Sequence, residues 1–315
     1  HPGYAFLAEN ADFARACADN GLVFIGPAPE CIERMGDKSS ARETMKACGV
    51  PTVPGSDGCI ETAAEAKAVA DTVGYPVLIK ATAGGGGKGM REVHDPADLE
   101  AQYQAARTEA GAAFGNDGVY LEKLVLRPRH VEIQVLADDF GNNIALCERD
   151  CSVQRRNQKL VEEAPAPFLP DTVMEQLARY SRNLFEAVGY VGLGTCEFMV
   201  TEQGKVYFLE VNPRLQVEHT VSEEVCGLDL VREQLTIANG GELTVEHPIR
   251  GHSFELRLTC EDPAKNLTPS SGTLTALRWP SGPGIRVDSG VLEGDTISPK
   301  FDSMMGKLVV TASDR

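Results

Sequence analysis

The sequence predicts an α/β (α+β) fold, and three patterns support this prediction. In the first 125 residues, segments with helical spacing of apolar residues alternate with short apolar strands. Two stretches of alternating apolar and polar residues follow, at 129–150 and 192–212, and each is broken by a turn sequence. From residue 251 onward, short strands are separated by Gly and Pro, which predicts a C-terminal antiparallel β lobe.

The N-terminal third reads as helices and strands with clear boundaries. Residues 11–30 predict a helix, a short strand and a loop, and 37–49 predict a second helix that ends at Gly49. Residues 50–58, VPTVPGSDG, hold two prolines and two glycines, which indicates a linker and a domain boundary. The lobe beyond it is predicted as helix 62–74, strand 75–81, a glycine turn into a second strand at 84–93, helix 95–115 and strand 118–125.

The middle of the chain predicts two hairpins and two helices. The hairpins turn at DDFGNN, residues 138–143, and at TEQG, residues 201–204. Helical patterns occupy 171–189 and 227–241.

Composition excludes several classes of protein. The 315 residues are 42% hydrophobic and 24% charged, which is typical of globular domains, and no apolar run reaches the ~20 residues of a membrane helix. A net charge of −16 argues against nucleic acid as a partner, so any anionic ligand needs local cations. The nine cysteines lack zinc-ligand spacing and predict reduced thiols in the cytoplasm, or in the mitochondrial matrix of a eukaryote. The opening HPGYAFLAEN reads as the middle of a fold, so we expect a fragment.

A glycine run is the first candidate site. Gly84 to Gly87 lie between two predicted strands, where backbone N–H groups can approach anionic oxygens. The alternative is an ordinary hairpin or linker, and the pattern is not a P-loop because the final K-[ST] is absent. Lys80 ends the preceding apolar strand, where a lysine is costly unless it meets an anion, and this favours phosphate.

The second hairpin carries a candidate metal site. With the turn centred on TEQG, Glu197 is expected opposite Phe208, which makes Glu210 its diagonal neighbour and puts Asn212 on the same face. Two carboxylates at that spacing repel unless a cation lies between them, and Mg²⁺ prefers such oxygens together with phosphates. The alternative is a pair of solvated glutamates on an outer face.

Two further segments contribute polar groups. In FLEVNPRLQVEHT, residues 208–220, extended chain places Glu210, Asn212, Arg214, Gln216 and Glu218 on one side, and Pro213 predicts that a strand ends near Asn212 and continues as an extended loop. Arg155, Arg156 and Lys159 form a cationic patch whose alternative is a charged surface loop. Together, these features predict an enzyme that binds a nucleoside triphosphate with magnesium and transfers a phosphoryl group.

A series of motifs then resembles, in order, the biotin carboxylase component of biotin-dependent carboxylases. It includes HPGYAFLAEN, MGDK, GGGGKGM, ERDCSVQRRNQKLVEEAPAP, GTCEFMV, GHSFELRLTCEDP and FDSMMGKLVV, while RHVEIQVLAD with NPRLQVEH is specific to that family within the ATP-grasp superfamily. The resemblance implies an ATP-grasp fold in four parts. These are a partial N-terminal α/β domain at 1–52, a lid with the glycine loop at 53–125, a central subdomain at 126–248 and a partial C-terminal β domain at 249–315.

The resemblance also implies an activity, the ATP-dependent carboxylation of biotin by bicarbonate through carboxyphosphate, which is a ligase reaction that forms a C–N bond. It implies roles by matched position. ATP is expected at Lys38, Lys80, Gly85, Gly86, Gly87, Glu122, Lys123, Val125, His130 and Gln154; Mg²⁺ or Mn²⁺ at Glu197, Glu210 and Asn212; and bicarbonate or biotin at Lys159, Arg214, Gln216, Val217, Glu218 and Arg286. Among these, Glu218 resembles the base, Lys159 and Arg214 the cationic clamps, and Arg286 the arginine that stabilises the biotin enolate.

The resemblance has departures and leaves alternatives. Ala5, Ala83 and Asn157 stand where many members carry glycine, glycine and histidine, and the asparagine motif resembles acyl-CoA carboxylases of the acetyl- or propionyl-CoA type. The partners implied are a biotin carrier domain and a carboxyltransferase, in a homo-oligomer or larger assembly, without nucleic acid or membrane. The alternatives are another ATP-grasp ligase, such as a carbamoyl phosphate synthetase half, or a non-catalytic truncated fragment.

Overall fold

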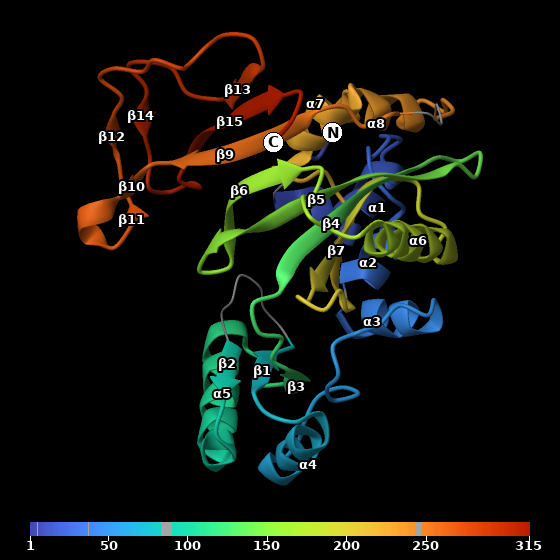
Figure 1. The fold of residues 1–315 in the computed structure, drawn as a ribbon, viewed down its shortest axis with the longest axis vertical. Coiled ribbons are helices and arrows are strands. Elements are labelled where there is room, and N and C mark those ends of the chain that lie inside the picture. Colours follow the sequence, from blue (N-terminus) through green and yellow to red (C-terminus); the bar gives the residue numbers. More distant parts are fainter. Residues whose placement is uncertain (5, 37, 83–89, 244–246) are drawn as a thin grey trace.

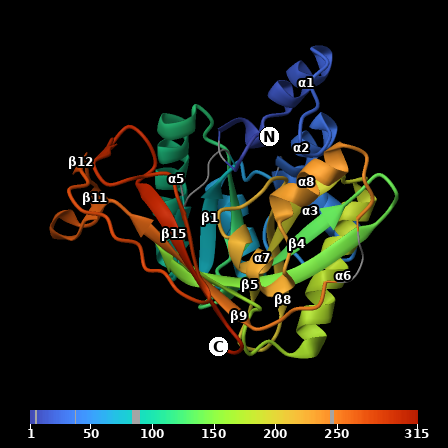
Figure 2. The same cartoon turned by 90° about the horizontal axis from the view of Figure 1, so that it is seen from above.

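The computed structural model describes the chain except residues 5, 37, 83–89 and 244–246, and except the side chains of 6, 38–40 and 42. It consists of a small three-stranded sheet and a large eight-stranded sheet, each packed against helices (Figure 1). Two-stranded ribbons near the C-terminus project on one side, and the N-terminal helices lie on the other (Figure 2). Among the described residues, no helix combines the length and apolarity needed to cross a membrane.

The N-terminal segment is helical, and here one sequence prediction is wrong. It forms η1 (Phe6–Glu9), α1 (Ala11–Asp19), α2 (Pro29–Gly36) and α3 (Lys38–Ala47). The strand predicted within 11–30 is absent from the described chain, where 22–26 are irregular and the side chains of Leu22 and Val23 are 63% and 71% exposed. Among the described strands, none pairs with this segment in a ladder. Helix α2 forms in place of the predicted loop, because Pro29 suits a helix start and Cys31, Ile32 and Met35 reach the core.

The small sheet has the order β2-β1-β3 and matches the predicted elements. Its strands are β1 (Val77–Ala81), β2 (Met90–Val93) and β3 (Val119–Lys123), and α4 (Ala63–Val73) and α5 (Leu99–Phe114) pack on them, with η2 (Pro96–Asp98) leading into α5. Ile79, Leu121 and Tyr103 are fully buried in the core of this unit, and the Tyr103 hydroxyl donates to the Ile60 carbonyl at 3.1 Å.

The large sheet is antiparallel throughout, with the order β13-β15-β9-β6-β5-β4-β7-β8. Both predicted hairpins form, as β4 (Arg129–Ala137) with β5 (Asn143–Arg155) and as β7 (Gly192–Val200) with β8 (Val206–Asn212). The cationic segment is not a surface loop. It is a hairpin, in which Arg155 ends β5, Lys159 lies in β6 (Gln158–Ala164), and Arg156 and Asn157 form the exposed turn with φ of 52° and 63°.

The C-terminal part is antiparallel β, as predicted, and its two long strands continue the large sheet. Strand β9 (His252–Thr259) pairs with β6 on one side and with β15 (Met304–Ala312) on the other, and β13 (Ile285–Ser289) forms the sheet edge. The rest consists of η3 (Pro263–Lys265) and two ribbons, β10 (Glu261–Asp262) with β11 (Thr268–Pro269) and β12 (Gly272–Thr273) with β14 (Thr296–Ile297).

Helices cover both faces of the large sheet. One face packs against α6 (Asp171–Ala187), α2 and α3, and the other packs against α7 (His219–Cys226) and α8 (Leu230–Ala238). Along β4, Val131, Ile133 and Val135 enter the first core. Because successive side chains alternate, Glu132 and Gln134 face the α7 side. Helices α6 and α8 match the sequence prediction, whereas α7 was not predicted, and its first two residues fall in the segment expected to be an extended loop.

Candidate active site

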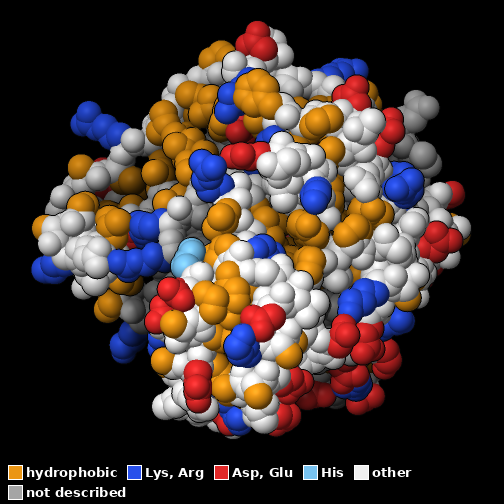
Figure 3. Space-filling view, turned by 60° about the horizontal axis from the view of Figure 1, so that its bottom comes forward, with side chains coloured by type: hydrophobic (Ala, Val, Ile, Leu, Met, Phe, Trp, Pro, Cys, Tyr) orange, Lys and Arg blue, Asp and Glu red, His pale blue; other side chains and the backbone are white. Residues whose placement is uncertain are grey.

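A cleft of about 720 Å³ lies between the small and the large sheet, and both line it. Leu78, Lys80 and Glu122 come from the small sheet, and the large sheet contributes polar side chains of β4 to β9. Figure 3 shows the small-sheet end forward, with acidic side chains gathered along one lower edge and Lys and Arg scattered over the rest. The basic groups inside the cleft are therefore a local feature of an acidic protein.

The two hairpin glutamates lie closer together than predicted. Glu197 pairs directly with Glu210, whereas Phe198 pairs with Phe208, because a bulge interrupts the ladder between these pairs. The predicted register, with Glu197 opposite Phe208, is wrong by two residues: the ladder beside the turn is shifted by one residue, so that Phe198 pairs with Phe208, and the bulge adds a second. Directly opposed residues share a face, with Cβ atoms about 4.5–5.5 Å apart, and the Asn212 amide donates to Glu197 Oε1 at 2.8 Å. The three proposed metal ligands therefore face the same side.

Lys159 is the centre of the buried charge in the cleft. Its Nζ lies 2.6 Å from Glu132 Oε2, 2.9 Å from Glu197 Oε1 and 2.6 Å from Glu218 Oε1. Burial disfavours the charged ammonium, but the three carboxylates outweigh it and raise the pKa of Lys159 well above its usual range. Lys159 is therefore a permanent cation.

Glu218 is held between two cations. Lys159 contacts one carboxylate oxygen, and Arg257 of β9 donates to the other at 2.8 Å. Burial alone would raise the pKa of Glu218, but Lys159 and Arg257 outweigh it and lower the pKa. Glu218 is thus an ionised, buried carboxylate that can accept a proton. Sequence reasoning missed Arg257, although Glu255 and Arg257 alternate within FELRL, and charged residues on one face of a strand were the available signal.

A second ion pair that sequence reasoning missed, between Arg149 and Glu132, adjoins this cluster. Arg149 is fully buried, and its Nε lies 2.5 Å from Glu132 Oε1 while Nη1 donates to Gln134 at 2.6 Å and to Ser222 at 2.8 Å. Burial alone would raise the pKa of Glu132, but Lys159 and Arg149 lower it to about 2. The signal in the sequence was the charged run Glu148, Arg149 and Asp150 in the middle of a predicted strand.

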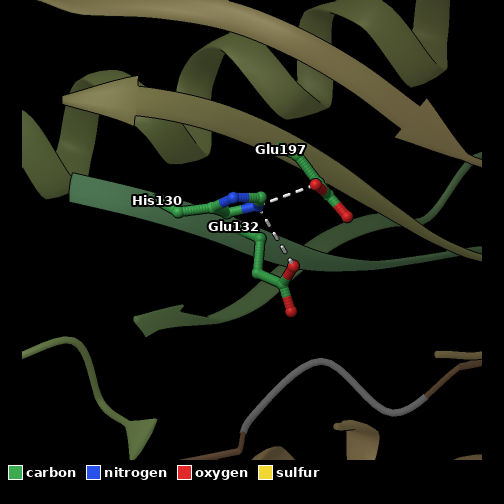
Figure 4. A group of neighbouring side chains, drawn as sticks. All are labelled: His130, Glu132 and Glu197. Carbon is green, nitrogen blue, oxygen red and sulfur yellow. Dashed lines mark ion pairs between the residues drawn. The ribbon is translucent and has the colours of Figure 1, made fainter. Parts of the chain in front are cut away.

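His130 and Gln154, two of the predicted nucleotide contacts, lie together in the cleft. His130 Nε2 lies 2.7 Å from Glu197 Oε2 and 4.0 Å from Glu132 Oε2 (Figure 4), and its Nδ1 lies 2.9 Å from the Gln154 amide nitrogen. Burial would lower the pKa of His130, but the Glu197 carboxylate raises it.

Of the other predicted ATP contacts, some line the cleft and others do not. Lys80 lies in the cleft, and its Nζ is 2.6 Å from Glu122 Oε2, so the anion expected for this lysine is a neighbouring side chain. Lys123 donates instead to the Gly74 and Tyr75 carbonyls, at 2.9 and 2.7 Å. Among the described residues, Lys123 and Val125 are not part of the cleft lining. The side chain of Lys38 and the glycines Gly85, Gly86 and Gly87 lie outside the described residues.

The loop after β8 presents its alternate side chains as predicted. Arg214, Gln216 and Glu218 line the cleft together with Val217, while Leu215 is buried in the core beside α7. The Arg214 guanidinium lies 3.0 Å from Glu9 Oε2 and donates to Asn212 Oδ1 at 3.0 Å, and the Gln216 amide donates to Glu197 at 2.9 Å.

Arg286 does not lie with Arg214, Gln216 and Glu218 in the described cleft lining. Its guanidinium contacts Glu223 at 2.7 Å and Asp288 at 2.9 Å, and within the described chain it does not line the cleft. The Arg155 and Lys159 side chains also separate, because neighbouring strand positions alternate and Arg155 pairs with Glu261 at 2.6 Å. The predicted cationic patch is therefore not a single surface.

The donor groups on β7 and β8 suit a hard divalent cation. Two opposed carboxylates and an amide oxygen are the ligands that Mg²⁺ prefers, and the adjoining cleft has room for phosphates. An ATP-dependent ligase site is the class of site that this fold and these residues suit, with donor groups for a hard cation, and beside them the buried, ionised Glu218 and the two cations that contact it.

Comparisons with known proteins place the chain in one family. Residues 1–32 match the biotin carboxylase N-terminal domain, 37–246 the carbamoyl-phosphate synthase L chain ATP binding domain, and 255–315 the biotin carboxylase C-terminal domain. A biotin carboxylase of Nostoc is 52% identical over all of this chain, which spans 71% of that protein.

Solved structures agree. A biotin carboxylase of Campylobacter jejuni superposes with a TM-score of 0.95 at 46% identity, over 99% of this chain and 70% of the other. The biotin carboxylase domain of 2-oxoglutarate carboxylase from Hydrogenobacter thermophilus, in complex with MgADP and bicarbonate, has a TM-score of 0.94 at 47% identity, over 100% and 70%. The chain belongs to the biotin carboxylase family, whose members are ATP-dependent ligases with the ATP-grasp fold.

Proposed function

We propose that this chain uses ATP and bicarbonate to carboxylate biotin, and that the Lys159 cluster is its reaction centre. The observation that carries the proposal is the position of Glu218. It is an ionised carboxylate between Lys159 and Arg257, in the cleft that the hairpin glutamates also line. The structural relative that holds MgADP and bicarbonate supports the same pair of ligands here.

ATP belongs at the small-sheet end of the cleft. Lys80, Glu122, His130 and Gln154 line that part, while the roles of Lys38 and of Gly85 to Gly87 rest on the resemblance alone. Glu197, Glu210 and Asn212 would hold the magnesium ion. When bound, the ion would neutralise charge on the phosphates.

Bicarbonate belongs beside the loop after β8. Arg214 and Lys159 supply positive charge for the anion, and Gln216 and the Val217 backbone complete the pocket. Glu218 accepts the bicarbonate proton, which makes the oxygen a better nucleophile toward the γ-phosphate. Its attack breaks the bond between the γ-phosphorus and the bridging oxygen of the β-phosphate, so that ADP leaves and carboxyphosphate forms. Because Arg257 contacts Glu218 and lines the cleft, we assign to Arg257 the enolate-stabilising role that the resemblance suggested for Arg286.

The test is phosphate release from MgATP by the full-length protein with free biotin, with and without bicarbonate. Release should require bicarbonate, and Glu218→Gln should lower it by a factor on the order of 10² to 10⁴, as for loss of a general base. Release that ignores bicarbonate and responds to ammonia would favour a carbamoyl phosphate synthetase type of ligase instead. Binding of MgATP without turnover would favour the non-catalytic alternative.

The remaining proposals concern the final acceptor, the partners, the location and the domain boundaries. Asn157 in RRNQK favours an acyl-CoA carboxylase, with acetyl- or propionyl-CoA as the final acceptor. Biotin would arrive on a carrier domain, and a carboxyltransferase would use the product, within a homo-oligomer or larger assembly. The nine cysteines are free in the structure, which supports a cytoplasmic or mitochondrial matrix location. We retain the four-part division at 1–52, 53–125, 126–248 and 249–315 as a proposal.

A further inference from the structure

Lys307 is a buried lysine outside the cleft lining that contacts the loop of the proposed base. It lies in the middle of β15 with 4% of its surface exposed, and its Nζ donates to the Val217 carbonyl at 2.6 Å. Val217 and Glu218 line the cleft directly before α7 begins at His219. A side chain of the C-terminal strand β15 therefore contacts the backbone of the proposed bicarbonate site.

Lys307 and Arg257 act on consecutive residues of this loop. They are direct partners in the ladder between β15 and β9, so the two cations stand side by side on one face of the sheet. Arg257 donates to the Glu218 carboxylate, and Lys307 donates to the carbonyl of the residue before it. One cation thus holds the side chain and the other holds the backbone.

The backbone contact holds the peptide unit that joins Val217 to Glu218. The Val217 carbonyl and the Glu218 N–H belong to one planar peptide, so fixing the carbonyl fixes the orientation of that plane. The preceding carbonyl, of Gln216, is held from the same stretch by the His219 Nδ1 at 2.7 Å. Two successive carbonyls of the loop are therefore tied down, which suits a site that must hold its groups in place before the reaction.

A simpler reading is that Lys307 only neutralises buried carboxylates. Its nearest carboxylate oxygens are Glu255 Oε2 and Asp288 Oδ2, both at 3.8 Å. Glu255 also accepts a hydrogen bond from the Thr220 hydroxyl, and Asp288 pairs with Arg286. Since the shortest contact of Lys307 is with a neutral carbonyl, a role as counter-ion to Glu255 and Asp288 does not explain the position of its ammonium group.

We propose that Lys307 is a positioning residue for bicarbonate activation, which it serves by fixing the Val217 carbonyl and hence the peptide that carries Glu218. This inference rests on the proposed function, because it assigns Val217 and Glu218 to bicarbonate. It predicts a selective defect. Loss of Lys307 weakens the use of bicarbonate and leaves the nucleotide end of the cleft, formed by other strands, unchanged.

The test compares Lys307→Met with wild type and with Lys300→Met, an exposed lysine in the loop before β15. In bicarbonate-dependent phosphate release, Lys307→Met should raise KM for bicarbonate or lower kcat by about 10- to 100-fold, the range expected for a lost hydrogen bond from a charged donor. KM for MgATP should stay within about twofold, and Lys300→Met should match wild type.

A double variant separates positioning from charge balance. Lys307→Met leaves the Glu255 carboxylate with less positive charge nearby, so the melting temperature of this variant should fall below that of wild type. Adding Glu255→Gln to the same chain should restore part of the lost melting temperature. If Lys307 positions the loop, the double variant stays defective toward bicarbonate, while Lys307→Arg, which keeps a charged donor, recovers activity. Recovery of bicarbonate use by the double variant, or an equal rise in both KM values, overturns the proposal. Wild type without bicarbonate-dependent release would instead overturn the proposed function and this inference with it.

Discussion

At the scale of single residues, the site is a balance of buried charges. Glu132, Glu197 and Glu218 are nearly inaccessible, and Lys159, Arg149 and Arg257 lie within ion-pair distance of them. Charges buried without partners are costly, and removal of one member of a buried pair typically costs about 3–5 kcal/mol. Each member of the cluster is therefore stabilised by its partners, and removal of one leaves another charge buried without compensation.

A pair of carboxyl groups beside this cluster sets a pH dependence. Glu162 and Glu255 are fully buried and directly opposed on β6 and β9. Burial, followed by neighbouring carboxylates, raises the pKa of Glu162 to about 8 and that of Glu255 to about 7, against the pull of Arg257 and Lys307. The folded protein thus keeps protons that the unfolded chain releases near pH 4.3.

The sign of the effect follows from proton binding. Because the folded pKa values are raised, the stability that these groups contribute is fully present below about pH 4.3 and is lost as the pH rises through 7 to 8. We expect the free energy of unfolding in urea to decline between pH 5 and 8, and Glu162→Gln to make the decline shallower. Glu175→Gln, an exposed glutamate of α6, should leave the slope unchanged. An identical slope in wild type and Glu162→Gln would rule this account out.

At the scale of elements, the linker 50–58 positions the small sheet. It is an extended segment that bridges Thr52 to Phe208 of β8 and Gly55 to Glu122 of β3. The Ser56 N–H donates to the Leu121 carbonyl at 2.8 Å, and the Lys123 N–H donates to the Pro54 carbonyl at 2.7 Å. The linker is therefore an edge partner of both sheets, and it defines one side of the space between them.

Gly55 is the position where this contact is tightest. A Cβ on it would lie 2.2 Å from the Leu121 carbonyl oxygen and 2.9 Å from the Glu122 Cα, and backbone cannot yield as a flexible side chain can. We expect Gly55→Ala to destabilise the protein by about 1–3 kcal/mol, as other overpacking changes do, and to raise KM for MgATP more than KM for bicarbonate, because Glu122 is displaced. Denaturant unfolding and steady-state kinetics measure both effects. Gly290→Ala, with open space around its Cβ, is the control, and equal behaviour of the two variants would contradict the argument.

At the scale of the whole molecule, the cleft joins two sheets with separate cores. The small sheet and its helices form one hydrophobic cluster, and the large sheet forms two others on its faces. Because residues of both sheets line the cleft, a bound nucleotide adds contacts between the small and the large sheet, which the linker also bridges. Binding to the folded state alone must raise the stability of the whole chain.

This gives a test of the proposed metal ligands that does not depend on turnover. MgATP at 100 times its Kd should stabilise the protein by about 2.7 kcal/mol, measured as a rise in melting temperature. Chelation of Mg²⁺ by EDTA should remove most of that rise, and Glu210→Gln should reduce it, whereas Glu202→Gln, in the exposed turn of the same hairpin, should not. A rise of equal size with and without Mg²⁺ would show that Glu197 and Glu210 do not act through a metal.

Local sequence patterns were sufficient for most of the fold. The helices α4, α5, α6 and α8 and both hairpins have periodicities that depend only on neighbouring residues and on one buried face. Helix α7 has no such pattern, because seven of its eight residues are buried and no polar face remains to show the helical period. The strand prediction for residues 22–26 was wrong because an apolar run forms a strand only when it can pair with another strand, and the run itself does not reveal whether a partner exists.

The same division applies to the site. The sequence by itself determined the family resemblance, the carboxylates of β7 and β8 and the alternation from Glu210 to Glu218, since each depends on residues close together in the chain. Only the tertiary structure decided the bulge that brings Glu197 opposite Glu210, the choice of Arg257 over Arg286 for the cleft, and the contacts of Arg149 and Lys307. These contacts join strands that are distant in sequence, and their positions depend on the strand order and register of the whole sheet, which no local pattern contains.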